Sequence, residues 1–258
     1  MNTSIEISNL ADYISQIDKI TRSEITYLYR GQENEVWRVT SSAYRRLEKQ
    51  VDADPDLLDD LFVGYVKQIV DEVQLKYPST YRDLFPLECM AHLQHNKVST
   101  GLIDFTFSPL VALWFACDSR EDANGKVLVL ENNSGRIEEI KTKMRLQQEL
   151  DAFFDADQAQ WYLWSPTLDS RAVDTERMNM QQSVFLFGLP EVDTDMINQE
   201  IIIRNGAKED IRTALEKMGI SEKTLFSDLL GFFERNTYAQ PYDQTLAEPY
   251  YGGISDGK

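Results

Sequence analysis

The chain has 258 residues, of which 43 are acidic and 26 basic, so its formal net charge is −17. Such a surface repels phosphate backbones, which argues against non-specific binding to DNA or RNA. With 42% hydrophobic residues, the chain can form one substantial core, and we predict a single domain over residues 1–236 followed by a flexible or surface-docked tail over residues 237–258. The longest apolar run, Leu110 to Cys117, is too short to cross a membrane, and residues 1–7 lack the features of a signal peptide. We therefore expect a cytoplasmic protein without membrane contact.

The first half of the chain predicts mostly helices. Apolar residues recur at helical spacing over residues 8–21 and 57–76, and Pro78 follows the longer stretch. One stretch instead shows the alternation of a strand. We expect helices over residues 8–21, 43–50, 57–76 and 87–95, and a strand over residues 25–31.

Arg30 lies in that predicted strand. The alternation places Tyr27 and Tyr29 on one face, and Leu28 and Arg30 on the other. An Arg that shares a face with an apolar neighbour needs an anionic partner, because an unpaired buried charge is costly. Two partners fit Arg30: a carboxylate such as Asp104, or the anionic group of a ligand.

The glutamate, histidine and cysteine residues near position 90 do not form a recognisable metal motif. Glu88, His92 and His95 share one helix face, and two imidazoles with a carboxylate could hold a divalent cation. No fourth ligand accompanies them, so we predict no metal site. Of the three, His95 is the better functional candidate because it ends its helix. Cys89 and Cys117 have no metal spacing, and we expect buried free thiols.

Residues 102–116 predict a strand, a tight turn and a helix. Ser108 suits the N-cap and Pro109 the first helical position. Two interpretations remain open for this turn. The helix N-terminus could bind a phosphate or a carboxylate, or Ser108 could simply begin a buried helix.

The second half alternates strands and helices. The aromatic cluster around Trp161 and Trp164 is predicted to be part of the core. We expect a charged helical stretch over residues 137–154, strands over residues 126–130, 182–188 and 200–204, and helices over residues 208–218 and from residue 221 onward.

Several separated blocks of the chain resemble the FRG family, which is named for its Phe/Tyr-Arg-Gly tripeptide. The blocks occur in the order that is typical of the family, and the resemblance covers about residues 20–236. The blocks are Tyr29-Arg30-Gly31-Gln32, Leu93-Gln94-His95, residues 102–116, residues 177–185 and residues 201–226.

The resemblance implies a fold and a ligand. FRG domains are mostly bacterial and are distantly similar to the ADP-ribosyltransferase fold, an α+β fold in which a split antiparallel or mixed sheet with helical insertions grips NAD. Carried over to this chain, Arg30 would hold the dinucleotide, and Thr106 or Ser108 would lie near the nicotinamide ribose. His95 would assist proton transfer. The nucleotide-binding residues that the resemblance implies are Arg30, Gly31, Gln32, Asp104, Thr106 and Ser108.

The chain departs from the family pattern at the position that usually supplies a catalytic Glu. Gln181 or Gln182 stands there, and a Gln can neither take a proton nor offset a developing positive charge. Two functions therefore remain open. One is an NAD-dependent ADP-ribosyltransferase or NAD glycohydrolase, acting as a toxin or phage-defence effector on a protein acceptor. The other is a non-catalytic sensor or adaptor that binds a nucleotide or a protein in the same cleft.

Overall fold

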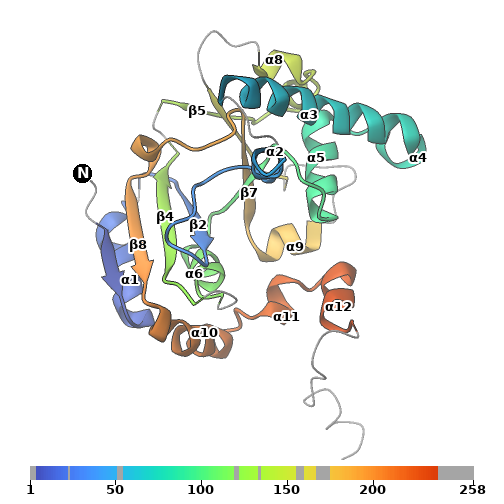
Figure 1. Ribbon diagram of the computed structural model, residues 1–258. Coiled ribbons are helices and arrows are strands. Elements are labelled where there is room, and N and C mark those ends of the chain that lie inside the picture. The colour runs from blue at the N-terminus through green and yellow to red at the C-terminus, as the bar shows by residue number, and fades with distance from the viewer. Residues whose placement is uncertain are drawn as a thin grey trace, which may run out of the picture.

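The computed structural model describes residues 4–22, 24–50, 55–118, 122–132, 135–154, 160–166 and 175–237. Except for residue 237, the predicted tail lies outside these ranges. The fold is α+β, as predicted, with helices packed on an open, mixed sheet of eight strands (Figure 1). The strand order is β1-β8-β4-β2-β3-β7-β6-β5. Within the described ranges, every helix is too short or too polar to cross a bilayer.

The strands are short, and the sheet is antiparallel except at its two edges, where β1 pairs with β8 and β5 pairs with β6 in parallel. The strands are β1 (Ile5–Ile7), β2 (Tyr27–Gln32), β3 (Ile103–Thr106), β4 (Gly125–Glu131), β5 (Ile137–Glu139), β6 (Trp161–Trp164), β7 (Ser183–Phe187) and β8 (Gln199–Ile203).

The helices occupy the predicted stretches and several more. They are α1 (Leu10–Ile20), α2 (Ser42–Glu48), α3 (Pro55–Lys76), α4 (Pro78–Tyr81), α5 (Pro86–His95), α6 (Pro109–Ala116), α7 (Lys143–Leu146), α8 (Asp151–Phe154), α9 (Thr175–Met180), α10 (Lys208–Lys217), α11 (Glu222–Leu225) and α12 (Leu229–Arg235).

The join between β2 and β3 determines where a site can form. Strand β2 pairs with β4 along its whole length, from Tyr27 to Gln32. It pairs with β3 at one position only, Tyr29 opposite Thr106. The two strands part beyond this pair, so the middle of the sheet is held by a single pairing and opens beside it.

Two helix groups cover one face of the sheet on either side of this join. The registers place Tyr29, Thr106 and Ser183 on the same face, since paired residues point the same way. Helices α1, α6 and α10 form one apolar cluster over β2, β4 and β8, and helices α2, α3 and α5 form another over β6 and β7 (Figure 1). A third cluster lies on the opposite face. The space between the first two clusters is where the site lies.

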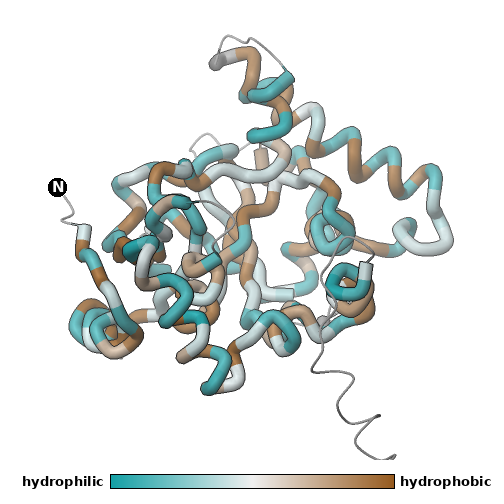
Figure 2. The backbone as a smooth tube through the Cα atoms, turned by 60° about the horizontal axis from the view of Figure 1, so that its bottom comes forward, coloured by the Kyte–Doolittle hydropathy of each residue, from teal (hydrophilic) through white to brown (hydrophobic). Residues whose placement is uncertain are grey.

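Local sequence explains the helices that frame this space. In α3, the buried residues recur every three or four positions, and hydrophobic and hydrophilic residues alternate along the helix (Figure 2). These residues are Leu58, Phe62, Val66, Val70 and Val73. At the start of α6, the Ser108 side chain accepts a hydrogen bond from the Val111 amide at 3.3 Å, and Pro109 takes the first helical position. Both roles were predicted.

Two predicted elements were wrong. Residues 137–154 are not helical throughout, because Ile137–Glu139 forms the edge strand β5. The neighbouring strand β6 is buried along its length, and β5 pairs with its free edge. The final helix, which was expected to run on from residue 221, is broken into α11 and α12, because Asp228 caps a new helix at its own position.

Candidate functional site

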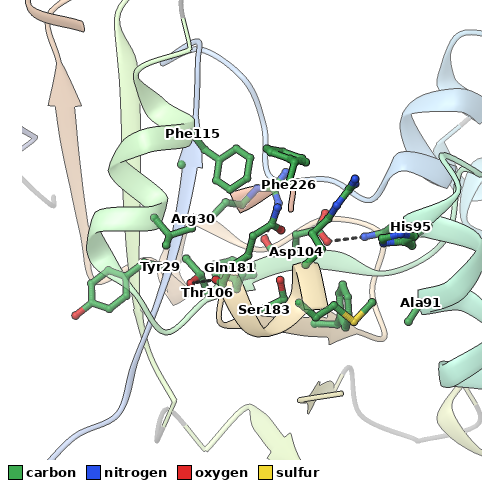
Figure 3. Close-up of a pocket in the computed structure, with 17 residues that line it drawn as sticks. Tyr29, Arg30, Ala91, His95, Asp104, Thr106, Phe115, Gln181, Ser183 and Phe226 are labelled. Carbon is green, nitrogen blue, oxygen red and sulfur yellow. Dashed lines mark hydrogen bonds between the residues drawn. The ribbon is translucent and has the colours of Figure 1, made fainter. Parts of the chain in front are cut away.

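A cavity of about 270 Å³ lies between the two helix groups, where β2 and β3 part (Figure 3). Its wall combines segments that are far apart in the sequence: strands β2, β3 and β7, helices α5, α6 and α9, the turn between α9 and β7, and the residue after α11. The polar and aromatic residues that matter most in this wall are Arg30, His95, Asp104, Thr106, Gln181 and Phe226.

Arg30 has no carboxylate partner in the described part of the chain. Its Nη1 donates a hydrogen bond to the backbone carbonyl of Asp104 at 2.6 Å. Its Nε is buried and has no hydrogen-bond partner there. Burial lowers the pKa of Arg30, while the nearby Asp104 carboxylate opposes this shift and Arg45 adds to it. Of the two partners predicted for Arg30, the structure lacks the ion-paired carboxylate, and a bound anion remains.

Asp104 presents a carboxylate to the same cavity. Its side chain is exposed, and Oδ1 accepts a hydrogen bond from Gln94 Nε2 at 2.7 Å. Gln94 is itself held by the hydroxyl of Thr100. This contact orients the Asp104 carboxylate, and its second oxygen is not used by any described residue. Asp104 can therefore offer a negative charge to a ligand.

The hydroxyls of Thr106 and Ser108 serve the protein itself. Thr106 Oγ1 donates to the carbonyl of Gln181 at 2.6 Å and accepts from the Ser108 amide at 3.0 Å. Thr106 lines the cavity and Ser108 does not. Since the side chain of Ser108 caps α6, the structure fits the second interpretation of this turn, the start of a buried helix.

Of the two glutamines, Gln181 faces the cavity. Its Nε2 donates to the Leu225 carbonyl at 3.0 Å, so its side chain ties the turn to the loop after α11. Gln182 adopts a left-handed conformation with φ 47°, and its carbonyl accepts the Phe107 amide at 3.1 Å. The pair forms the turn between α9 and β7, and the strand begins only at Ser183.

His95 contacts a buried carboxylate that the sequence did not indicate. Its Nε2 lies 2.8 Å from Oδ2 of Asp228, whose side chain is completely buried. Arg177 Nη2 donates to the other oxygen at 2.7 Å, and the Arg177 guanidinium lies 4.7 Å from the centre of the Phe226 ring. Burial tends to raise the pKa of Asp228, but the hydrogen bonds from Arg177 and the Gly231 amide and the charges of Arg177 and His95 outweigh it, so the pKa is lowered.

Sequence reasoning gave no role to Asp228, Arg177 or Phe226. A signal existed for Asp228, because an Asp immediately before an apolar helical run is a typical N-cap, and its Oδ1 does accept the Gly231 amide at 3.0 Å. Arg177 belongs to one of the resembling blocks, although nothing there identified its partner. Phe226 packs on Phe115, with ring centres 6.1 Å apart, above Arg30 in Figure 3.

The other candidate ligands of a metal are occupied separately. Glu88 accepts the Phe85 amide at 3.1 Å at the start of α5, and His92 Nδ1 lies 2.8 Å from the Tyr81 hydroxyl. Across the described ranges, no group of three or more His, Cys, Asp or Glu side chains is placed to share a cation. Cys89 and Cys117 are buried free thiols.

A second cavity of about 610 Å³ adjoins the first and shares Arg30, Gly31 and Phe115 with it. Gln32 lies in its wall. Gly31 lines both cavities and lies where β2 packs closely on α6, since a Cβ at this position would lie 1.9 Å from the Ala112 carbonyl oxygen. The tetrapeptide from Tyr29 to Gln32 thus borders both cavities, with Arg30 at their junction.

Residues 25–125 match the family model of the FRG domain. The chain contains an FRG domain. No curated protein and no solved structure matches the chain. The FRG segment supplies Arg30, Gly31, Gln32, His95, Asp104 and Thr106, whereas Arg177, Gln181, Phe226 and Asp228 come from residues beyond it. The cavity is therefore built jointly by the FRG domain and the C-terminal part of the chain.

Proposed function

We propose that this FRG protein binds NAD across its two adjoining cavities and cleaves the bond between nicotinamide and ribose, as an ADP-ribosyltransferase or an NAD glycohydrolase. The observation that carries the proposal is Arg30, a cation at the junction of the cavities that has no ion-pair partner among the described residues. NAD has its two phosphates at its centre and a nucleoside at each end. An Arg between two cavities matches that distribution of charge.

Cavity size and sheet geometry support the same proposal. The volumes of about 270 and 610 Å³ are in the range of small-molecule sites, and the smaller one suits a single nucleoside. The parting of β2 and β3 beside Tyr29 and Thr106 agrees with the resemblance to the split sheet of the ADP-ribosyltransferase fold.

Asp104 can supply the charge that Gln181 cannot. Cleavage of the nicotinamide–ribose bond leaves positive charge on the ribose in the transition state, and a fixed carboxylate stabilises that charge. Asp104 lies in the smaller cavity with one oxygen held by Gln94 and the other available. His95, oriented by Asp228, is the candidate for moving a proton from the acceptor. The acceptor is a protein side chain in a transferase and water in a glycohydrolase.

Nicotinamide release from NAD tests this function. Purified protein is incubated with NAD, with and without bacterial lysate as a source of protein acceptors, and NAD binding is measured in parallel. We expect release by the unaltered protein, loss of binding in Arg30→Met, and release about a hundredfold slower with binding retained in Asp104→Asn. Arg204→Met is the matched control, because Arg204 is exposed and pairs with Glu6 at the sheet edge. Absence of both release and binding would overturn the proposal.

The alternative is a non-catalytic sensor or adaptor, in which the cleft recognises a nucleotide or a protein without chemistry. One observation favours it: the Gln181 amide is bound to the Leu225 carbonyl, so this residue shapes the wall instead of acting on a ligand. NAD binding that depends on Arg30, combined with no nicotinamide release under any condition, would select this alternative.

A further inference from the structure

The second cavity contains a buried acceptor to which no described residue donates a hydrogen bond. Gln32 is only 5% exposed, and its Nε2 donates to the Arg38 carbonyl at 3.1 Å. Its Oε1 is buried and has no partner among the described residues. If the oxygen and nitrogen of the Gln32 amide were exchanged, the oxygen would face the Arg38 carbonyl, and two acceptors would meet without a donor. This contact therefore determines the orientation of the amide. A buried carbonyl left in this state is costly, and a ligand N–H group would satisfy it.

Several cations line the same cavity, and most of them form no ion pair within the described ranges. Of the four cations in its wall, Arg38 is paired with Glu48 and with Glu191. Arg45 instead donates to the Thr40 carbonyl. For Arg45, Lys49 and Arg30, the described part of the chain provides no ion pair. The wall also contains Glu33, Glu48 and Asp118, but Glu48 is paired with Arg38 and Asp118 with Arg212. Three cations without an ion pair in the described ranges, in a chain of net charge −17, favour a bound phosphate.

An aromatic ring lines the second cavity together with the Gln32 acceptor and the cations. Trp37 belongs to the wall of this cavity and is 38% exposed. Exposed aromatic rings are suited to stacking on a nucleobase, since every base has a flat π-face. An acceptor for an N–H group, cations for a phosphate and a ring for a base occur together on one side of Arg30.

We propose that the second cavity is a subsite for adenosine monophosphate, the half of NAD that does not carry nicotinamide. The adenine stacks on Trp37, its amino group donates to Gln32 Oε1, and the phosphate lies among Arg30, Arg45 and Lys49. This assignment rests on the proposed binding of NAD, but it specifies a separate recognition event, which AMP alone can report.

The test compares AMP with IMP, in which an oxygen replaces the adenine amino group. Calorimetry on the unaltered protein is expected to show IMP binding about tenfold more weakly than AMP, since its oxygen would face the Gln32 carbonyl. In Gln32→Met, the two nucleotides are expected to bind equally. Lys49→Gln should weaken both by about threefold to tenfold, and Lys217→Gln, an exposed Lys on α10, should weaken neither.

The outcomes separate this inference from the proposed function. If NAD binds while AMP does not, or while AMP and IMP bind alike, the adenine subsite is overturned and the NAD proposal stands. If AMP binds with the expected preference but NAD is neither bound nor cleaved, the subsite stands and the NAD proposal falls. If neither ligand binds, both are overturned. Because the AMP and IMP comparison uses the unaltered protein, it holds even if Gln32→Met does not fold.

Discussion

Nε2 of His95 lies 2.8 Å from Oδ2 of Asp228, and the Asp228 side chain is completely buried. His95 ends a helix of the FRG domain, whereas Asp228 begins α12 near the end of the described chain. The same carboxylate also accepts hydrogen bonds from Arg177 and from the Gly231 amide. One side chain thus fastens the C-terminal wall of the cavity to the FRG domain.

Asp228→Asn is expected to lower the free energy of unfolding by about 3 kcal/mol at neutral pH, because it leaves the Arg177 guanidinium without its buried counter-charge. The folded pKa of Asp228 is lowered from 3.8, so its stabilisation is present above 3.8 and is lost as the pH falls through the folded value. Urea midpoints of the two proteins should therefore converge under strongly acidic conditions. Asp18→Asn, an exposed site on α1, is the control. Equal midpoints at neutral pH would contradict the role given to Asp228.

Arg30 and Arg177 make a matched pair of arginines in one cavity wall. Arg30→Met should leave the free energy of unfolding within about 1 kcal/mol of the original value. The substitution breaks no described ion pair, and it removes a charge whose burial is unfavourable. Arg177→Met should lower the free energy of unfolding by about 3 kcal/mol, because it leaves the buried Asp228 carboxylate without the guanidinium that neutralises it. Denaturant titration of both variants checks this contrast. A large loss in Arg30→Met would mean that Arg30 is structural.

Substitution by Ala should change the stability of the protein in opposite directions at Gly31 and at Gly64. At Gly31 the new Cβ would meet the Ala112 carbonyl oxygen at 1.9 Å, both of them backbone-fixed, so we expect a loss of about 4 kcal/mol or more. At Gly64, within α3, the Cβ meets nothing within 4 Å, and Gly64→Ala should stabilise the helix by about 0.5–1 kcal/mol. Thermal midpoints of the two variants give the comparison, and a tolerated Gly31→Ala would show that β2 can move away from α6.

Both thiols should be unreactive in the folded protein. Burial raises the pKa of Cys89 to about 12 and that of Cys117 to about 12 as well, and the thiolate is the reactive form. A chromogenic disulfide reagent at neutral pH should therefore label neither residue in buffer and both in concentrated denaturant. Rapid labelling of the native protein would indicate local opening of α5 or α6.

The regular part of the fold could be predicted from the sequence because it depends on local pattern. The apolar spacing of α3 and the cap at Ser108 are properties of a few adjacent residues. Strand β5 could not be predicted, since a short charged segment becomes a strand only when the edge of β6 is available to it.

Only the part of the site that lies in the sequence motifs could be predicted. Arg30, His95 and Asp104 lie in motifs and were identified as candidates. The N-cap role of Asp228 has a local signal, but its contacts with His95 and Arg177 join distant segments, which no local pattern reveals. The choice between Gln181 and Gln182 needed the left-handed turn at Gln182, because a shift of one residue exchanges the faces of a strand.

Because β2 and β3 pair at one position only, the strands themselves form part of the cavity wall that a ligand would contact. Tyr29 and Phe105 border the cavity, yet their side chains belong to two different cores, and the Tyr29 ring points away from the cavity in Figure 3. At this position the wall is backbone that is already paired in the sheet, Tyr29 with Val129 and Phe105 with Val184. A ligand therefore meets a surface whose shape is fixed before it binds, and little conformational freedom is lost there on binding.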